Sequence, residues 1–184
     1  MWPHTVAILI GGKSSRMGTP KHEVTLRGGT TMLEAMRTFA SETAKHTIIV
    51  GGAIEGQQCV QDLKPGLGPV AGIEALLSSN HDDRYLVVGC DMPLLTTQTA
   101  KLLFTDGDAV VFSGDSKNAP FSALPLVISS HCKHACSAYL ESGGRSLRGF
   151  LQEIVCRVVP RPMGVDEELS SINTPEQLNN CAFE

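Results

Sequence analysis

The sequence predicts a three-layer α/β fold in which an open, mostly parallel β-sheet carries helices on both faces. Short apolar runs, of the length of a buried strand, recur along the chain, and several of them stop at glycine or aspartate turns. Between these runs lie segments with apolar residues at helical spacing, and this alternation predicts βαβ units. The 184 residues are 42% apolar and 18% charged. This size and composition fit a single domain, residues 1–184, with a sizeable core.

Each element is predicted from a local pattern. The first strand, residues 5–10, is a β-branched apolar run that ends in paired glycines, and the first helix, residues 31–43, gathers its large apolar residues on one stripe. The last helix would follow a cap at Asn173 or Thr174, with Pro175 in its first turn. In chain order we expect strand 5–10, helix 31–43, strand 47–50, helix 70–79, strand 85–89, helix 98–104, strands 109–112 and 122–128, helices 131–141 and 146–153, strand 155–159 and helix 174–180.

Composition and charge exclude several classes of protein. The net charge of −4 argues against binding to nucleic acid or to an anionic membrane, both of which favour a basic surface. No apolar run is long enough to span a bilayer, and the N-terminal segment has neither the basic region nor the cleavage site of a signal peptide. The six cysteines form no CxxC pair, so we expect reduced thiols in a cytoplasmic enzyme, which we take to be a monomer.

The loop after the first strand gathers groups that bind anions. Residues 9–21 read Leu-Ile-Gly-Gly-Lys-Ser-Ser-Arg-Met-Gly-Thr-Pro-Lys. The paired glycines let backbone N–H groups approach an anion, and Lys13, Arg16 and Lys21 concentrate positive charge in a mildly acidic chain. The loop is not a Walker A motif, because alanine stands five residues before Gly12 where glycine is required, and GxGxxG fits no frame. From these residues alone, a polyphosphate site and a solvated glycine-rich turn both remain open.

The whole string resembles the signature of the molybdenum cofactor guanylyltransferase family, Leu-Ala-Gly-Gly-x-Ser-x-Arg-Met-Gly-x-x-Lys, and departs from its specified positions at Ile10. Three further segments resemble family motifs in the same order: Asp62 followed by Gly68-Pro69-Val70-Ala71-Gly72, then Cys90-Asp91-Met92-Pro93-Leu94, then Ile172-Asn173-Thr174-Pro175-Glu176. The stretch from about 114 to 165 matches only loosely. The resemblance implies a Rossmann-like nucleotidyltransferase fold whose N-terminal half binds nucleotide and whose C-terminal half binds molybdopterin.

The resemblance implies transfer of GMP from GTP to the terminal phosphate of molybdopterin, or of its molybdenum-loaded form, with release of pyrophosphate. Because the attacking phosphate is already an anion, groups that position and neutralise the phosphates matter more than a strong base. The implied catalytic residues are Arg16, Lys21 and Asp91, whereas Lys13 is expected to be a bystander. The implied GTP-binding residues are Leu9, Gly11, Gly12, Ser14, Lys21, Asp62, Gly68, Pro69 and Asp91.

Asp91 is the expected magnesium ligand. It lies just beyond the carboxyl end of a predicted parallel strand, where ligands bind in open α/β sheets. A carboxylate there suits Mg²⁺, which prefers oxygen ligands and bridges nucleotide phosphates, and the resemblance implies the same role. A turn-forming aspartate is the alternative. Asn173 could complete the metal shell, contact molybdopterin or cap the last helix, and these roles are compatible.

Two other segments invite a functional interpretation. The turn Ser142-Gly143-Gly144-Arg145-Ser146 precedes a helix, and Arg145 is a candidate contact for the molybdopterin phosphate, although such turns are more often solvated loops. The segment His131-Cys132-Lys133-His134-Ala135-Cys136 contains two histidines and two cysteines but lacks the second ligand pair of a typical zinc site. We expect its cysteines to be buried and its histidines to be exposed.

Two kinds of alternative function remain open from the sequence. A cytidylyltransferase acting on the same molybdopterin, or another small nucleotidyltransferase, would share the fold, but the glycine pair of the loop and the 68–72 segment favour guanine. A nucleotide-binding partner without turnover, acting in molybdoenzyme maturation, is disfavoured because Arg16, Lys21 and Asp91 are all present. The other expected partners are proteins of cofactor biosynthesis and apo-molybdoenzymes.

Overall fold

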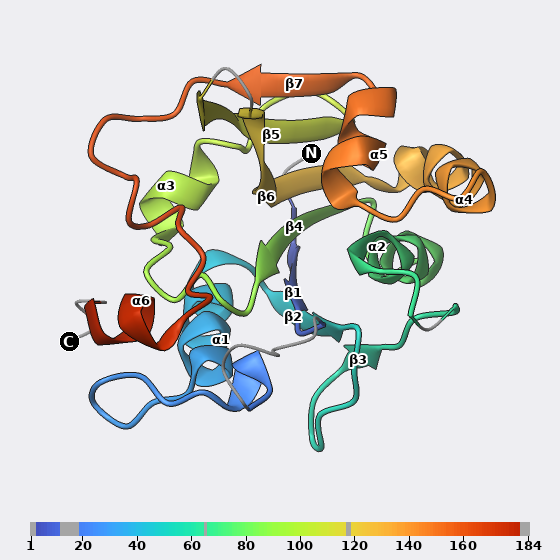
Figure 1. The fold of residues 1–184 in the computed structure, drawn as a ribbon. Helices are drawn as coiled ribbons and strands as arrows, with labels where there is room; N and C mark the ends of the chain where they lie inside the picture. The colour runs from blue at the N-terminus through green and yellow to red at the C-terminus, as the bar shows by residue number, and fades with distance from the viewer. Residues whose placement is uncertain (1–2, 12–18, 65, 117–118, 181–184) are drawn as a thin grey trace.

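The computed structural model is built on a seven-stranded sheet with the strand order β3-β2-β1-β4-β6-β5-β7 (Figure 1). It describes residues 3–11, 19–64, 66–116 and 119–180. Within these residues β6 alone runs antiparallel to its neighbours. The strands are β1 Thr5–Leu9, β2 His46–Val50, β3 Cys59–Val60, β4 Arg84–Gly89, β5 Ala109–Ser116, β6 Ala119–Ser129 and β7 Cys156–Val159.

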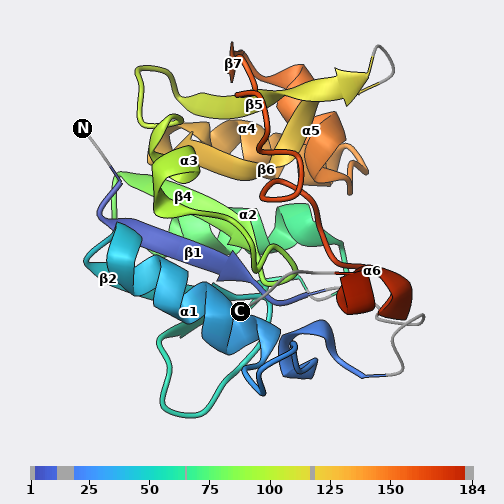
Figure 2. The ribbon, with the colours of Figure 1, turned by 90° about the vertical axis from the view of Figure 1, so that its left-hand side faces the viewer.

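Helices cover both faces of the sheet. One face carries α1 and α3, and the other carries α2, α4 and α5 (Figures 1 and 2). The α-helices are α1 Met32–Thr43, α2 Pro69–Ser78, α3 Thr97–Lys101, α4 Lys133–Glu141, α5 Leu147–Glu153 and α6 Pro175–Asn180, and the short 3₁₀ helices are η1 Lys21–Glu23 and η2 Ser130–Cys132. No helix in the described ranges combines the length and the apolar character needed to cross a bilayer.

Side chains of each strand alternate between two hydrophobic cores. On β1, Val6 and Ile8 join the core that includes Met36 of α1, whereas Ala7 joins the core that includes Ile73 of α2. This alternation follows from the two-residue period of a strand. Because both faces of the central strands β1 and β4 are buried, these strands are almost wholly apolar. The predicted three-layer, mostly parallel fold is confirmed.

The structure departs from the predicted elements at a few points. The sequence analysis predicts neither β3 nor η1, because two or three residues are too few to show a period. Helix α3 ends at Lys101 rather than at Phe104, since Leu103 and Phe104 donate to carbonyls three residues earlier and tighten the last turn. Strand β6 begins at Ala119, earlier than predicted, because it forms a long hairpin with β5.

The parallel strands place their carboxyl ends along one edge of the sheet. In Figure 2 the arrows of β1 and β5 point toward this edge, where α6 lies, and the segment from β7 to α6 runs down it. The chain passes from β1 to β2 and β3 on one side of β1 and returns to β4 on the other side. Such a reversal of strand order creates a crevice beyond the carboxyl ends, here between β1 and β4.

Candidate active site

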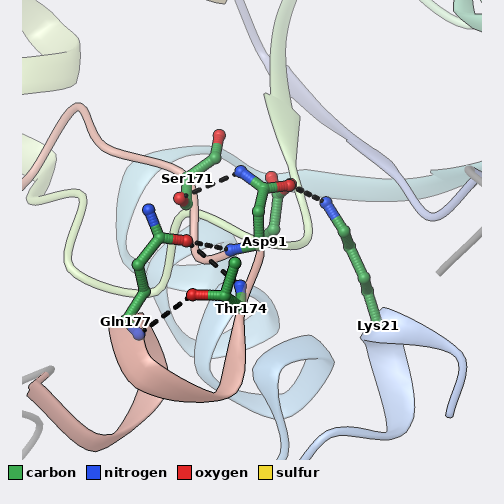
Figure 3. Close-up of polar contacts among 6 residues, drawn as sticks. Lys21, Asp91, Ser171, Thr174 and Gln177 are labelled. Atoms are coloured by element: carbon green, nitrogen blue, oxygen red, sulfur yellow. Dashed lines mark hydrogen bonds and ion pairs between the residues drawn. The ribbon is translucent and has the colours of Figure 1, made fainter. Parts of the chain in front are cut away.

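Three side chains meet beyond the carboxyl end of β4: Lys21, Asp91 and Asn173, hereafter the Lys21 cluster (Figure 3). Lys21 Nζ lies 2.6 Å from Asp91 Oδ2 and also donates a hydrogen bond to Asn173 Oδ1. The Lys21 and Asp91 side chains are 20% and 17% exposed, so the pair is shielded but can be reached from solvent. Asp91 and Asn173 lie 70 and 152 residues from Lys21 in the sequence, so only the folded chain assembles the cluster.

Backbone contacts fix Asn173 beside Asp91. The N–H of Ile172 donates to the carbonyl of Asp91 at 2.8 Å, which ties the segment before α6 to the loop after β4. Asn173 Nδ2 donates to the carbonyl of Ser171 at 3.1 Å. The amide oxygen of Asn173 therefore faces Lys21, an orientation that the chemistry requires because an ammonium group can only donate.

Thr174, and not Asn173, caps helix α6. Thr174 Oγ1 accepts the N–H of Gln177 at 3.2 Å, and Pro175 follows as the first helical residue. Gln177 Oε1 accepts the backbone N–H groups of Asn173 and Thr174 at 2.7 and 3.1 Å. The capping groups thus satisfy the backbone at this end and leave the Asn173 side chain for the Lys21 cluster.

Cys90, the residue before Asp91, is part of the core and is not a reactive thiol. It is 3% exposed, and burial, with a smaller effect of the Asp91 carboxylate, raises the pKa of its thiol to about 12. Because the thiolate is the nucleophilic form, Cys90 stays unreactive at neutral pH. Its backbone N–H donates to the carbonyl of Leu9 at 3.0 Å, which holds the Asp91 loop against the end of β1.

A pocket of about 700 Å³ lies at the carboxyl ends of β1 and β2, beside the N-terminus of α2. The predicted GTP-binding residues Leu9, Gly11, Asp62, Gly68 and Pro69 line it together. The sequence analysis misses four further lining residues, Val50, Gly51, Gly66 and Gly72. The glycine pair after β2 could have identified Gly51, because it ends a neighbouring parallel strand at the same edge.

Two glycines of this pocket are required by close approaches. Gly68 has φ +80°, and a Cβ there would lie 2.8 Å from the carbonyl oxygen of Arg145. A Cβ at Gly72 would lie 3.0 Å from Val50 Cγ1 and 3.2 Å from Asp62 Oδ1. Gly68 therefore lets the start of α2 lie close to the Arg145 turn, and Gly72 lets α2 pack close against β2 and Asp62.

Asp62 has an oxygen that lacks a partner. Its Oδ1 is shielded from solvent and accepts no hydrogen bond from the described residues. Burial raises the pKa of this carboxyl above its usual value. Buried acceptors are nearly always satisfied, so this oxygen is open to a donor from water or from a molecule in the pocket.

The turn at residues 142–146 has a structural explanation. The ring of Tyr139 packs against Gly144 and Gly149, where any Cβ would overlap it. Arg145 Nη1 donates to the carbonyl of Leu140, at the C-terminal end of α4, at 2.9 Å and to the carbonyl of Gly144, in the turn, at 2.6 Å. The predicted contact of Arg145 with molybdopterin stays a prediction, and its guanidinium group is already engaged in this turn.

The cysteines and histidines of the 131–136 segment lie as predicted. Cys132 and Cys136 are buried, and burial raises the pKa values of their thiols to about 11 and about 12. His131 is exposed, and its Nδ1 lies 3.2 Å from Asp108 Oδ1. His134 is also exposed. Within the described ranges, no three histidine, cysteine or acidic side chains are grouped as a metal site would require.

Part of the predicted site lies outside the described residues. These positions are Gly12, Ser14 and Arg16, together with the expected bystander Lys13. The described ends of this loop are Gly11, which lines the pocket, and Lys21, which joins the cluster. The predicted loop therefore joins the nucleotide-sized pocket to the Lys21 cluster.

Comparison with known proteins assigns the family. Residues 6–157 match the MobA-like NTP transferase domain. The chain belongs to this family. A molybdenum cofactor guanylyltransferase of Xanthomonas euvesicatoria is 26% identical over 185 residues, covering 99% of this chain and 96% of that protein. A probable molybdenum cofactor guanylyltransferase of Carboxydothermus hydrogenoformans is 34% identical over 189 residues, covering 93% of this chain and 91% of that protein.

Solved structures support the same assignment of this MobA-like transferase. Molybdopterin-guanine dinucleotide biosynthesis protein A from Archaeoglobus fulgidus is similar with a TM-score of 0.79 at 25% identity, covering 96% of this chain and 95% of that chain. A 2-C-methyl-D-erythritol 4-phosphate cytidylyltransferase from Thermus thermophilus shares the fold, with a TM-score of 0.68 at 16% identity and 95% coverage of both chains. The predicted nucleotidyltransferase fold and enzyme class are therefore confirmed.

Proposed function

We propose that this chain transfers GMP from GTP to the molybdopterin form of the molybdenum cofactor and releases pyrophosphate. The observation that carries the proposal is the Lys21 cluster beside a pocket whose volume suits a nucleoside. A phosphate oxygen of molybdopterin would attack the α-phosphorus of GTP, forming a new P–O–P linkage while the bond to the β-phosphate breaks. Family membership and relatives named as guanylyltransferases support guanine as the base.

The pocket would hold the guanosine part of GTP. Asp62 Oδ1, buried without a partner among the described residues, would accept a hydrogen bond from a donor on guanosine. Leu9, Gly68 and Pro69 would enclose the nucleoside, and Gly11 would let its phosphates pass close to the backbone. We assign the nucleotide to the N-terminal half of the chain and molybdopterin to the C-terminal half.

Lys21 would bind the phosphates of GTP. Its ammonium group is held at the edge of the crevice by two oxygens, so it is placed where an anion can replace Asp91 as its partner. Arg16, in the same loop, would contact the β- and γ-phosphates with its planar fork. The attacking phosphate needs no strong base, and these cations would reduce the repulsion between the two anionic substrates.

The Lys21 cluster also fits a magnesium ion. The carboxylate oxygen of Asp91 and the amide oxygen of Asn173 converge on one positive charge, the Lys21 ammonium, and oxygens of this kind are the ligands that Mg²⁺ prefers. We propose that Asp91 holds the ion and that Asn173 completes its shell. When bound, Mg²⁺ would neutralise charge that develops on the phosphates.

Pyrophosphate release by purified protein and molybdopterin tests the proposal, with GTP, CTP and ATP compared. We expect release with GTP. A preference for CTP would instead assign the chain as a cytidylyltransferase, and absence of release with every nucleotide would point to a binding partner without turnover. Both outcomes would overturn the proposal.

The role of Asp91 is tested by Asp91→Ala, with Asp106→Ala as the matched control because Asp106 is an exposed carboxylate in the loop before β5. We expect Asp91→Ala to lose turnover by about 100-fold or more while its circular dichroism is unchanged. Asp106→Ala should retain turnover. Full activity of Asp91→Ala would remove Asp91 from the catalytic residues.

We also propose that the protein acts in the cytoplasm as a monomer and hands its product to apo-molybdoenzymes, with help from other proteins of cofactor biosynthesis. Cys59, Cys90, Cys132, Cys136 and Cys156 are free thiols, which suits a reducing compartment. Light scattering coupled to size-exclusion chromatography would test whether the protein is a monomer, since a dimer would have twice the 19.6 kDa mass of the chain.

A further inference from the structure

A second cleft opens at the same edge of the sheet. It has a volume of about 460 Å³, and its walls include Phe121 and Ser122 of β6, Arg148 of α5, and Arg161 and Asp166 after β7. In the strand order, β4 with Asp91 separates this side of the sheet from β1 and β2, which carry the nucleotide pocket. The cleft therefore lies on the other side of Asp91 from the nucleotide.

Arg161 is held in a fixed position in this cleft. Its backbone N–H donates to Ser113 Oγ at 2.9 Å, and its Nη2 donates to Ser122 Oγ at 3.1 Å. Its Nη1 donates to Asp166 Oδ1 at 2.9 Å, and its Nε is shielded and finds no acceptor among the described residues. A guanidinium has five N–H groups, so the bonds named here leave several donors for an incoming anion.

The charges of the cleft favour an anion. Arg161 and Arg148 contribute two positive charges against the single negative charge of Asp166, in a chain whose net charge is −4. The Asp166 side chain is 75% exposed and the Arg161 side chain is 17% exposed. An ion pair with such an exposed partner is weak, because water competes for the carboxylate. An anionic ligand can therefore displace Asp166 from Arg161.

The cleft is connected to the Lys21 cluster by a short segment. Ser170 lines the cleft and Asn173 belongs to the cluster, so the two Cα atoms lie within about 11 Å, the reach of three extended residues. Phe121, only 7% exposed, contributes an apolar wall. A flat anionic molecule in the cleft can thus extend a phosphate toward Asn173.

We propose that this cleft binds the anionic acceptor, with Arg161 as its main contact and Arg148 as a second positive charge. The inference rests on the proposed function, because it places molybdopterin on the side of Asp91 away from GTP. The acceptor's ring system lies against Phe121, and its terminal phosphate reaches the Lys21 cluster, where it attacks GTP. Arg161 binds and orients the acceptor and takes no part in the bond changes.

The test compares Arg161→Gln with Arg157→Gln. Arg157 is an exposed residue of β7 and pairs with Val110, toward the opposite edge of the sheet, so the two variants change the net charge equally. Steady-state rates are measured with molybdopterin varied at saturating GTP, and GTP binding is measured by calorimetry. We expect Arg161→Gln to raise the KM for molybdopterin about tenfold or more, the loss of a charge-assisted hydrogen bond, without changing the GTP dissociation constant.

Two further variants keep the proposal open to refutation if Arg161→Gln folds poorly. Arg161→Lys keeps the charge, and its KM for molybdopterin should lie between the values of wild type and Arg161→Gln. Asp166→Asn changes an exposed side chain and should lower the KM for molybdopterin about two- to threefold, because it removes a competing negative charge. An unchanged KM in Asp166→Asn, or equal KM values in Arg161→Gln and Arg157→Gln, would overturn the inference.

Equilibrium binding separates this inference from the proposed function. The fluorescence of molybdopterin is titrated with each protein in the absence of nucleotide. If wild type binds molybdopterin but produces no pyrophosphate, the proposed function fails, and weaker binding by Arg161→Gln alone would still support the cleft. Equal binding by Arg161→Gln, Arg157→Gln and wild type would refute the cleft even if guanylyl transfer is observed.

Discussion

Replacing Lys21 with methionine should tighten the binding of divalent metal ions by the nucleotide-free protein while weakening its binding of GTP. Lys21 Nζ lies 2.6 Å from Asp91 Oδ2, the oxygen proposed to hold magnesium. A metal ion on that oxygen would lie close to the positive ammonium group, so the two cations repel each other and Lys21 acts as an internal competitor. Methionine retains most of the length of the side chain and removes the charge.

The size of the effect follows from the exposure of the pair. Fully exposed ion pairs are worth about 0.2–1 kcal/mol, and buried pairs cost about 3–5 kcal/mol when one partner is removed. Lys21 and Asp91 are 20% and 17% exposed, which places the pair between these limits. We take about 1–1.5 kcal/mol as the free energy that a metal ion must overcome to displace Lys21. Since 1.4 kcal/mol is about tenfold in affinity, Lys21→Met should bind the metal about five- to tenfold more tightly.

Manganese, followed by electron paramagnetic resonance at low ionic strength, provides the assay because it is a spectroscopic substitute for magnesium. Lys101→Met is the matched control, since Lys101 is an exposed lysine at the end of α3 and its loss changes the net charge equally. GTP affinity, measured by calorimetry, should fall about tenfold or more in Lys21→Met, through loss of a charge-assisted bond to phosphate. If Lys21→Met binds manganese no more tightly than Lys101→Met, Lys21 does not compete for Asp91 and the reasoning is refuted.

Two further predictions concern the nucleotide pocket. Gly68→Ala should lower the free energy of unfolding by about 3 kcal/mol or more, since a Cβ there combines φ +80° with a 2.8 Å approach to the Arg145 carbonyl. Gly56 has φ +71° with open space around it, so Gly56→Ala should lower the free energy of unfolding by only about 1–2 kcal/mol. Equal losses for Gly68→Ala and Gly56→Ala in urea denaturation would contradict this account. For Asp62, burial raises the pKa of the folded state above the ordinary value of an aspartate. Above about pH 4, the folded state therefore binds more protons than the unfolded state until the folded pKa is passed. The unfolding free energy should therefore fall as pH rises through this window in wild type, and Asp62→Asn should remove that fall; an unchanged pH profile would show that Asp62 is not desolvated.

The sequence predicts most of the sheet because its signal is local. Buried parallel strands such as β1 and β4 are short apolar runs between turns, and such runs stand out without knowledge of their neighbours. The direction of β6 has no local signal, because an apolar run looks the same whether it pairs parallel or antiparallel. Its orientation follows from pairing with β5 and β4, which only the folded chain reveals.

The candidate site is predictable to a similar extent. Asp91 can be placed at the binding edge because residues after parallel strands gather there, and Asp62 and Gly68 follow from the family motif. Arg161 follows the parallel strand β7, but no family motif marks it. It lies in the stretch that matches the family loosely, and the serines that hold it, Ser113 and Ser122, are 48 and 39 residues away in the sequence. Its position after a strand does not by itself mark it, because the groups that hold it come from distant segments.

The topology would allow the two proposed anionic substrates to meet without sharing a pocket. The chain reverses direction across the sheet between β1 and β4, so the loops after these two strands separate and leave a crevice at their carboxyl ends. In the proposed arrangement, GTP would enter from the β2 side, where glycines keep the pocket open, and the acceptor would enter from the β6 side, where Arg161 supplies positive charge. Asp91 stands after the strand between these sides, and Lys21 and Asn173 reach it from distant segments. The Lys21 ammonium therefore lies where the two phosphates would meet, and we expect it to lower the repulsion between the substrates there.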